Sequence, residues 1–246
     1  MTTRDITFPS AGGRPMRAAI ATHDDGRIRP GVIVIHEIFG LNDDIRAITA
    51  RLAGLGYVAL APDLYDGHGM RLVCVARTMR TLRRGEGEAF RDLEAARTFL
   101  QQQPGVDPSR LGVIGFCMGG GFALLHAVHA PLKAAATFYG DVPKTADELR
   151  GVCPVLGSYG GRDRMFAPQG ERLNRLLAEL GLDHDVKLYP EAGHSFMSDN
   201  KGVLAAIGAW GPMKVGYNRD AAEDSWKRIE AFFGRHLGNQ ARAADA

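Results

Sequence analysis

Cysteine is scarce in this sequence, and its few residues stand far apart. The 246 residues include 3 cysteines, Cys74, Cys117 and Cys153, and none of them forms a CxxC pair. An odd, widely spaced set excludes a disulfide framework and a cysteine-ligated zinc cluster. Phosphate-loop and dinucleotide fingerprints are also missing. We therefore expect a protein of the reducing cytoplasm that uses no metal ion and no cofactor.

The sequence also has no long apolar run and no excess of one charge. No apolar run reaches the roughly 20 residues that cross a bilayer, and residues 1–9 do not read as a secretory signal. The 30 Lys and Arg and the 28 Asp and Glu are interspersed, with a formal net charge of +2. This balance disfavours nucleic acid or a membrane as a partner and favours a small molecule. We expect a monomer or a weak homodimer.

Short apolar runs alternate with amphipathic segments along the chain. Runs typical of buried strands lie at residues 31–35, 57–60, 111–114, 134–138, 155–159 and 186–189. Helical spacing of apolar residues predicts helices at 43–54, 88–101, 171–180 and 221–237. The alternation predicts an α/β fold, with a doubly wound, mostly parallel sheet flanked by helices in one domain over residues 1–246.

A glycine-flanked cysteine stands between a predicted strand and an apolar helical segment. The run Gly115-Phe116-Cys117-Met118-Gly119 matches the G-x-nucleophile-x-G elbow. The nucleophile of such an elbow lies in a strained turn, where side chains at the flanking positions would collide. It also lies at a helix N-terminus, which favours a thiolate. The alternative is a glycine-rich turn around a structural cysteine.

A carboxylate and a histidine follow Cys117 in the order that α/β-hydrolases use. Asp163 stands in a glycine turn after the run 155–159, and His194 stands in a turn after 186–189. Taken singly, the first is more ordinary as a helix cap and the second as an exposed loop histidine. Since all three come in the order nucleophile, acid, base, each just beyond a strand, they predict a catalytic triad.

The motifs of this sequence resemble those of the dienelactone hydrolase family, of the α/β-hydrolase superfamily, from about residue 31 to 233. The matching runs are His36-Glu37-Ile38-Phe39-Gly40, Pro62-Asp63-Leu64-Tyr65, Gly115-Phe116-Cys117-Met118-Gly119-Gly120, Gly160-Gly161-Arg162-Asp163 and Ala192-Gly193-His194-Ser195-Phe196. The resemblance implies that Glu37 contacts the resting thiol and helps to deprotonate it once substrate enters. It also implies an oxyanion hole formed by the backbone N–H groups of Met118 and Ile38.

The substrate is expected to differ from that of the best-known member of the family. That activity uses arginines to hold a carboxylate, one of them four residues beyond the catalytic histidine, where this sequence has Ser198. A hydroxyl does not replace a bidentate arginine, so a less charged ester or lactone is expected. The alternative is that an upstream arginine compensates, one of Arg71, Arg77, Arg80, Arg83 and Arg84. We predict substrate contacts from Phe39, Tyr65, Phe196 and Ser198, and a lid loop at residues 197–218.

The leading hypothesis is a cofactor-free hydrolase that cleaves a small ester or lactone through an acyl-enzyme on Cys117. Amides fit less well, because a thiolate is readily expelled from a tetrahedral intermediate whose other group leaves poorly. Two alternatives share the fold: a thiol-dependent acyl transferase, and a ligand-binding or sensor protein without turnover. The intact triad argues against the sensor.

Overall fold

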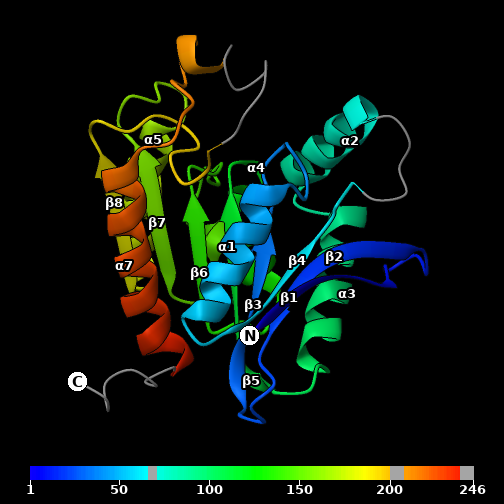
Figure 1. The fold of residues 1–246 in the computed structure, drawn as a ribbon. Helices are drawn as coiled ribbons and strands as arrows, with labels where there is room; N and C mark the ends of the chain where they lie inside the picture. The colour runs from blue at the N-terminus through cyan, green and yellow to red at the C-terminus, as the bar shows by residue number, and fades with distance from the viewer. Residues whose placement is uncertain (66–70, 200–207, 239–246) are drawn as a thin grey trace.

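An eight-stranded sheet forms the centre of the computed structural model, which describes residues 1–65, 71–199 and 208–238. The strand order is β1-β2-β4-β3-β5-β6-β7-β8 (Figure 1). The strands are β1 (Thr2–Pro9), β2 (Pro15–Thr22), β3 (Arg29–Ile35), β4 (Val58–Pro62), β5 (Val106–Phe116), β6 (Ala134–Phe138), β7 (Val155–Gly160) and β8 (His184–Tyr189). β1 and β2 pair antiparallel, as do β2 and β4, and every other pairing is parallel.

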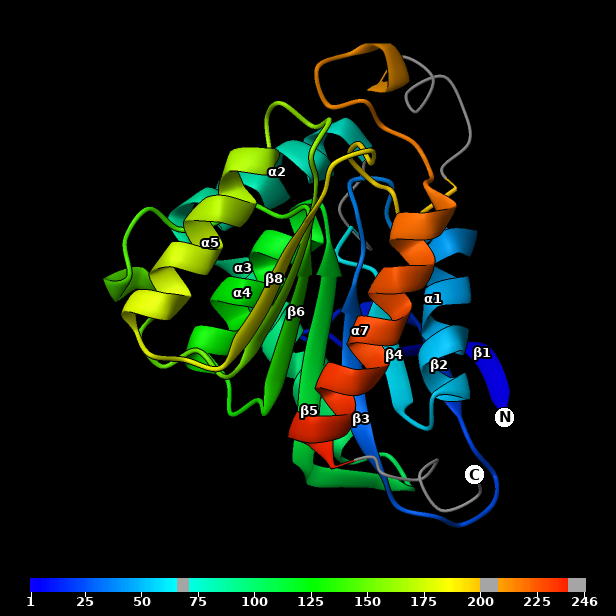
Figure 2. The ribbon, with the colours of Figure 1, turned by 90° about the vertical axis from the view of Figure 1, so that its left-hand side faces the viewer.

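Helices cover both faces of the sheet. They are α1 (Asp43–Gly54), α2 (Arg71–Arg84), α3 (Glu88–Gln101), α4 (Met118–His129), α5 (Ala167–Glu179) and α7 (Arg219–Leu237), with the short 3-10 helix η1 (Asp147–Leu149) before β7. α1 and α7 lie on one face, and α2, α3, α4 and α5 lie on the other (Figure 2). The predicted α/β fold with a mostly parallel sheet is confirmed.

The predicted strands and two of the predicted helices lie where their sequence patterns indicate. β6 is fully buried, and so are residues 30–35 of β3, as expected for parallel strands covered on both faces. α1 and α3 have the predicted bounds. α1 begins at its N-cap Asn42, whose side chain accepts a hydrogen bond from the N–H of Ile45 (3.1 Å). Local patterning and capping therefore determine these elements.

The N-terminal hairpin was not predicted. β1 carries mostly exposed polar side chains, and only Phe8 is buried, so the strand lacks the alternation that marks a half-buried strand. Its backbone pairs with β2 along the whole strand, from Thr2 opposite Thr22 to Pro9 opposite Pro15. β1 is an edge strand whose conformation comes from this pairing and not from its own side chains.

Helix α2 was also missed, and α5 begins earlier than predicted. The buried stripe of α2 consists of Cys74, Thr78 and Leu82, so half-polar residues occupy the inner face and weaken the apolar signal. α5 begins at Ala167 and not at residue 171, because Pro168 is accommodated in its first turn.

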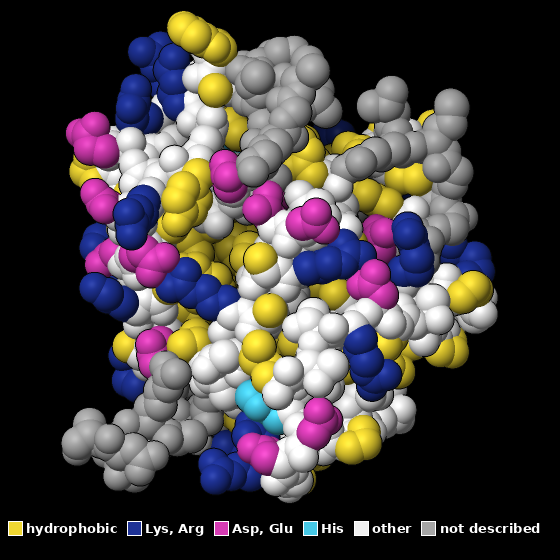
Figure 3. All heavy atoms as spheres, viewed as in Figure 1, with side chains coloured by type: hydrophobic (Ala, Val, Ile, Leu, Met, Phe, Trp, Pro, Cys, Tyr) yellow, Lys and Arg dark blue, Asp and Glu magenta, His cyan; other side chains and the backbone are white. Residues whose placement is uncertain are grey.

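Charged side chains of both signs are interspersed on the face drawn in Figure 3. Among the helices in the described ranges, none combines the length and hydropathy of a membrane span. Part of the predicted lid, residues 200–207, lies outside the described residues. In the described part, Trp210 is 88% exposed. The lid function therefore stays a prediction.

Candidate active site

Cys117 occupies the turn between β5 and α4. Its backbone has φ 54°, in the left-handed region, and its N–H donates to the carbonyl of Phe138 (2.9 Å). A Cβ at Gly115 would collide with the carbonyl of Gly119, and a Cβ at Gly119 would collide with the carbonyls of Ile35 and His36. The elbow therefore needs glycine on both sides of the cysteine, as its sequence predicts.

Asp163 and His194 form a buried hydrogen-bonded pair beyond β7 and β8. The Nδ1 atom of His194 donates to Oδ2 of Asp163 over 2.6 Å, and both residues are buried. The other oxygen of Asp163 accepts from the backbone N–H groups of Met165 (3.0 Å) and Phe166 (3.1 Å). These contacts fix the carboxylate and select the imidazole tautomer that leaves Nε2 available.

The charge state of His194 follows from competing influences. Burial by itself lowers the pKa of His194, but neighbouring Cys117 and the hydrogen bond to Asp163 raise the pKa to about 10. Nε2 has no hydrogen-bond partner among the residues that the structure describes. The imidazole is thus protonated at neutral pH, and its second nitrogen is free for chemistry.

Cys117 opens into a pocket of about 210 Å³ that Met118 and Ile38 also line. Within residues 1–65, 71–199 and 208–238, no hydrogen bond engages the backbone N–H of either Met118 or Ile38. Unpaired backbone N–H groups beside a nucleophile are the usual donors for an oxyanion. These atoms have the surroundings that the predicted oxyanion hole requires.

A model of the dienelactone hydrolase family matches residues 16–237. The chain belongs to the dienelactone hydrolase family. A relative from Yersinia pestis, named "Putative carboxymethylenebutenolidase", is 33% identical over 249 residues, which cover 94% of this chain and 88% of the relative. Family membership and this relative make the chain a dienelactone hydrolase-like hydrolase.

Solved structures agree with the family and the fold. A dienelactone hydrolase-like promiscuous phosphotriesterase from metagenomic libraries is 30% identical with a TM-score of 0.79, covering 96% of this chain and 98% of that one. An esterase from Pyrobaculum calidifontis is 19% identical with a TM-score of 0.66, covering 95% and 85% of the two chains, and shows the fold alone. The α/β-hydrolase fold is therefore shared beyond the family.

Glu37, whose match to the dienelactone hydrolase motif suggested a role, is buried directly after β3. Ser198 donates to Oε1 of Glu37 over 3.5 Å, at the long end of a hydrogen bond. Burial, and then the charge of Glu37, raise the pKa of Tyr139 well above its usual value, which indicates that the phenol lies near this carboxylate. The contact between Glu37 and the thiol of Cys117 stays a prediction.

Two residues that support the site, His36 and Tyr139, were given no role by the sequence analysis. The buried imidazole of His36 donates from Nδ1 to the carbonyl of Glu37 (2.7 Å) and accepts at Nε2 from the N–H of Leu64 (3.0 Å). The ring of Tyr139 lies 4.9 Å from that of His194. Both follow or end a strand at the carboxyl edge of the sheet, and that position is the signal that marks them.

The predicted substrate contacts lie around the pocket and not in its wall. Tyr65 donates its hydroxyl to the sulfur of Met118 (3.5 Å), and Phe39 is half-buried after Ile38. Ser198 is buried against Glu37, and Phe196 is fully buried with its ring 5.2 Å from that of Tyr139. In this structure Phe196 therefore supports Tyr139 from the core and is shielded from a ligand in the pocket.

The pocket wall comes mainly from residues that the sequence analysis did not single out. They are Met79 and Leu82 of α2, Asp141 after β6, and Met165, Phe166 and Gln169 near the start of α5. The spacing of Met79 and Leu82 on one helix face, and the position of Met165 and Phe166 just after the acid, are the signals that could have found them.

Residues 212–216, within the predicted lid, connect the loops that carry Asp163 and His194. The carbonyl of Met213 accepts from the N–H of His194 (2.8 Å), and the N–H of Gly216 donates to the carbonyl of His194 (3.0 Å). The carbonyl of Pro212 accepts from the N–H of Arg164, beside the acid (3.1 Å). Residues 212–216 thus hold the His194 loop and the Asp163 loop in a fixed position relative to each other.

Proposed function

We propose that this protein hydrolyses a small ester or lactone through an acyl-enzyme, with Cys117 as nucleophile, His194 as acid and base, and Asp163 as its orienting partner. The observation that carries the proposal is that Cys117 shares one small pocket with the unpaired N–H groups of Met118 and Ile38, beside the buried His194–Asp163 pair. Nucleophile, base and oxyanion donors are the parts that acyl transfer requires.

Acylation starts from a thiolate at Cys117 and an imidazolium at His194. The Cys117 thiolate attacks the carbonyl carbon, and the carbonyl oxygen becomes an oxyanion held by the N–H groups of Met118 and Ile38. When the intermediate collapses, the alkoxide leaves and takes the proton from Nε2 of His194. The high pKa of His194 ensures that this proton is present at neutral pH.

Deacylation needs His194 in the opposite state, and the acyl group itself brings this about. Once Cys117 is a thioester, its negative charge is gone, so one of the influences that raise the pKa of His194 is removed. The neutral imidazole then takes a proton from water, and the hydroxide attacks the thioester carbon. The acid is released, and the proton on His194 again faces a thiolate.

Glu37 is assigned to the first deprotonation of the thiol. Its carboxylate is buried and accepts a hydrogen bond from Ser198 (3.5 Å), and its charge is among the influences that raise the pKa of Tyr139. A buried carboxylate at the same edge of the sheet as Cys117 can serve as the base for the Cys117 thiol.

The test of this function is to trap the acyl-enzyme. An aryl acetate is mixed with the protein, quenched in acid after milliseconds to seconds, and analysed by intact-protein and peptide mass spectrometry. We expect one acetyl group per chain, on the peptide that carries Cys117, during turnover. Hydrolysis without any acylated peptide, or acylation of Cys74 or Cys153 alone, would contradict the proposal. Transfer of the acetyl group to an added alcohol or amine in preference to water would favour the acyl transferase.

The pocket wall predicts a preference for uncharged acyl groups. It contains one carboxylate, Asp141, beside apolar side chains, and none of its described residues is Lys or Arg. We expect kcat/KM to be about 10- to 100-fold lower for an ester whose acyl chain ends in a carboxylate than for its neutral analogue, because that carboxylate loses water without gaining a cation.

The comparison uses two esters with the same leaving group. Asp141→Asn should narrow the gap, since it removes a like charge from the wall. Asp147→Asn in η1 is the matched control, because Asp147 is exposed and pairs with Arg150 away from the pocket. A native preference for the carboxylated ester would show that an unrecognised cation binds it.

A further inference from the structure

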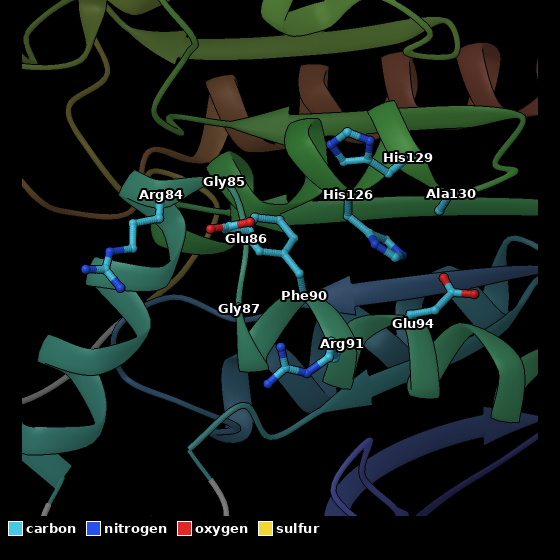
Figure 4. A pocket seen from close by; sticks show the side chains of 10 residues that line it. All are labelled: Arg84, Gly85, Glu86, Gly87, Phe90, Arg91, Glu94, His126, His129 and Ala130. Carbon is cyan, nitrogen blue, oxygen red and sulfur yellow. The ribbon is translucent and has the colours of Figure 1, made fainter.

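A larger cavity lies on the side of the molecule occupied by α3 and the end of α4. It has a volume of about 610 Å³ and is lined by residues of α2, α3, α4 and the turn between α2 and α3 (Figure 4). The lining includes charged, aromatic and imidazole side chains, namely Arg84, Phe90, Arg91, Glu94, His126 and His129. None of these six lines the pocket of Cys117. α4 separates the two sites: Cys117 precedes its first residue, and His126 and His129 lie in its last turn, about 15 Å away along the axis.

His126 is the feature of this cavity that ordinary packing does not explain. The residue is only 4% exposed, yet its Nε2 atom has no hydrogen-bond partner among the residues that the structure describes. Figure 4 shows its ring pointing from α4 toward α3. Burial lowers the pKa of His126 to about 4, so the ring is neutral at physiological pH and offers one N–H and one lone pair. A buried imidazole nitrogen gains from a polar partner supplied by a ligand.

The charges of the lining favour an anion. Arg97 holds Glu94 through contacts of 2.6 and 3.0 Å, so the carboxylate of Glu94 is already compensated. Arg84 and Arg91, in contrast, make no ion pair or side-chain hydrogen bond with any residue in the described ranges, and the exposed Glu86 is the other acidic residue of the lining. The lining therefore holds two guanidinium groups and one carboxylate that make no ion pair within the described ranges.

The ring of Phe90 supplies an aromatic surface in the same cavity as the two arginines and His126. Phe90 is half-buried, and its ring packs against Phe122 with the ring centres 4.9 Å apart. In the view of Figure 4, the guanidinium group of Arg84 lies to the left of Phe90, that of Arg91 lies below it, and His126 lies to its right. A planar ligand on Phe90 can present an anion to one side and a hydrogen-bonding group to the other.

We propose that this cavity is a second binding site, for a small aromatic carboxylate that carries a ring hydroxyl. Arg84 and Arg91 bind the carboxylate, Phe90 packs against the ring, and the hydroxyl hydrogen-bonds to Nε2 of His126. The site is separate from ester hydrolysis at Cys117, so its occupant is a ligand and not the substrate of that reaction.

The probe is 4-hydroxybenzoate, titrated into the full chain by calorimetry, with the His126 imidazole followed by ¹⁵N NMR. We expect saturable binding that shifts the Nε2 resonance of His126, and at least tenfold weaker binding by Arg84→Gln and Arg91→Gln. Arg150→Gln is the matched control, since Arg150 is a surface arginine paired with Asp147. Benzoate, which lacks the hydroxyl, should bind about tenfold more weakly without shifting that resonance in the same way.

Binding at the catalytic pocket is separated by blocking Cys117 with iodoacetamide, which should leave the affinity for 4-hydroxybenzoate unchanged. Loss of binding after alkylation would assign the ligand to the pocket of Cys117 and overturn the proposal. So would full affinity in both Arg→Gln variants, or no binding at millimolar probe. Each of these outcomes leaves hydrolysis of a neutral ester, and thus the proposed function, untouched.

Discussion

Replacing Cys117 by alanine should abolish ester hydrolysis and leave the fold intact. The proposed reaction forms its covalent bond at this sulfur, and loss of a triad nucleophile costs about six orders of magnitude in kcat where it has been measured. The fold should survive, because alanine and cysteine share the same backbone preferences at φ 54°, and the side chain is only half-buried. Initial rates with an aryl ester, beside the thermal unfolding midpoint, measure the two expectations separately.

Cys153→Ala is the matched control for this experiment. Burial raises the pKa of Cys153 to about 12, so its thiol stays protonated and is a poor nucleophile at neutral pH. We expect this variant to hydrolyse the ester at close to the native rate and to be inactivated by iodoacetamide like the native protein. Near-native turnover by Cys117→Ala would remove Cys117 from the mechanism. A native protein that binds esters without turning them over would favour the sensor instead.

The three residues of the candidate triad could be singled out from the sequence because their signals are local. Cys117 has glycine on both sides, and Asp163 and His194 each stand in a turn directly after an apolar run. Since parallel strands end at the same edge of the sheet, three such turns converge once the fold is parallel. The sequence therefore predicted the observed Asp163–His194 contact without knowledge of the distance between them.

The pocket wall could not be predicted, because it depends on packing between distant segments. Met79 and Leu82 reach the pocket only when α2 lies against α4, and the inner face of α2 carries Thr78 and Cys74 in place of a clear apolar stripe. Ser198 shows the same limit. Its position suggested a substrate contact, but its hydroxyl lies against Glu37.

The second large effect on kcat is expected from replacing His194 or its partner Asp163. His194→Ala and Asp163→Asn should each lower kcat by about two to four orders of magnitude, the range expected when a general base or its orienting group is lost. Asp163 touches Nδ1 of His194 and acts through it. The double variant should therefore be close to His194→Ala alone, because the residues act as a unit. If the losses in kcat of the two single variants multiply in the double variant, Asp163 has a separate role, such as holding the 165–166 turn.

The pH dependence of Asp163→Asn distinguishes an electrostatic role of Asp163 from a merely structural one. Acylation needs the imidazolium of His194, so in the native protein its rate should fall as the pH rises through the raised pKa, at about 10. The hydrogen bond to Asp163 is one of the influences that raise this pKa. Its loss in Asp163→Asn lowers the pKa of His194, so the alkaline fall should move to lower pH. The measurement is the presteady-state burst rate with an aryl ester between pH 6 and 11. A fall that stays at the native pH, with only the amplitude reduced, would mean that Asp163 positions the ring without changing its charge, because the pKa would then depend on Cys117 alone.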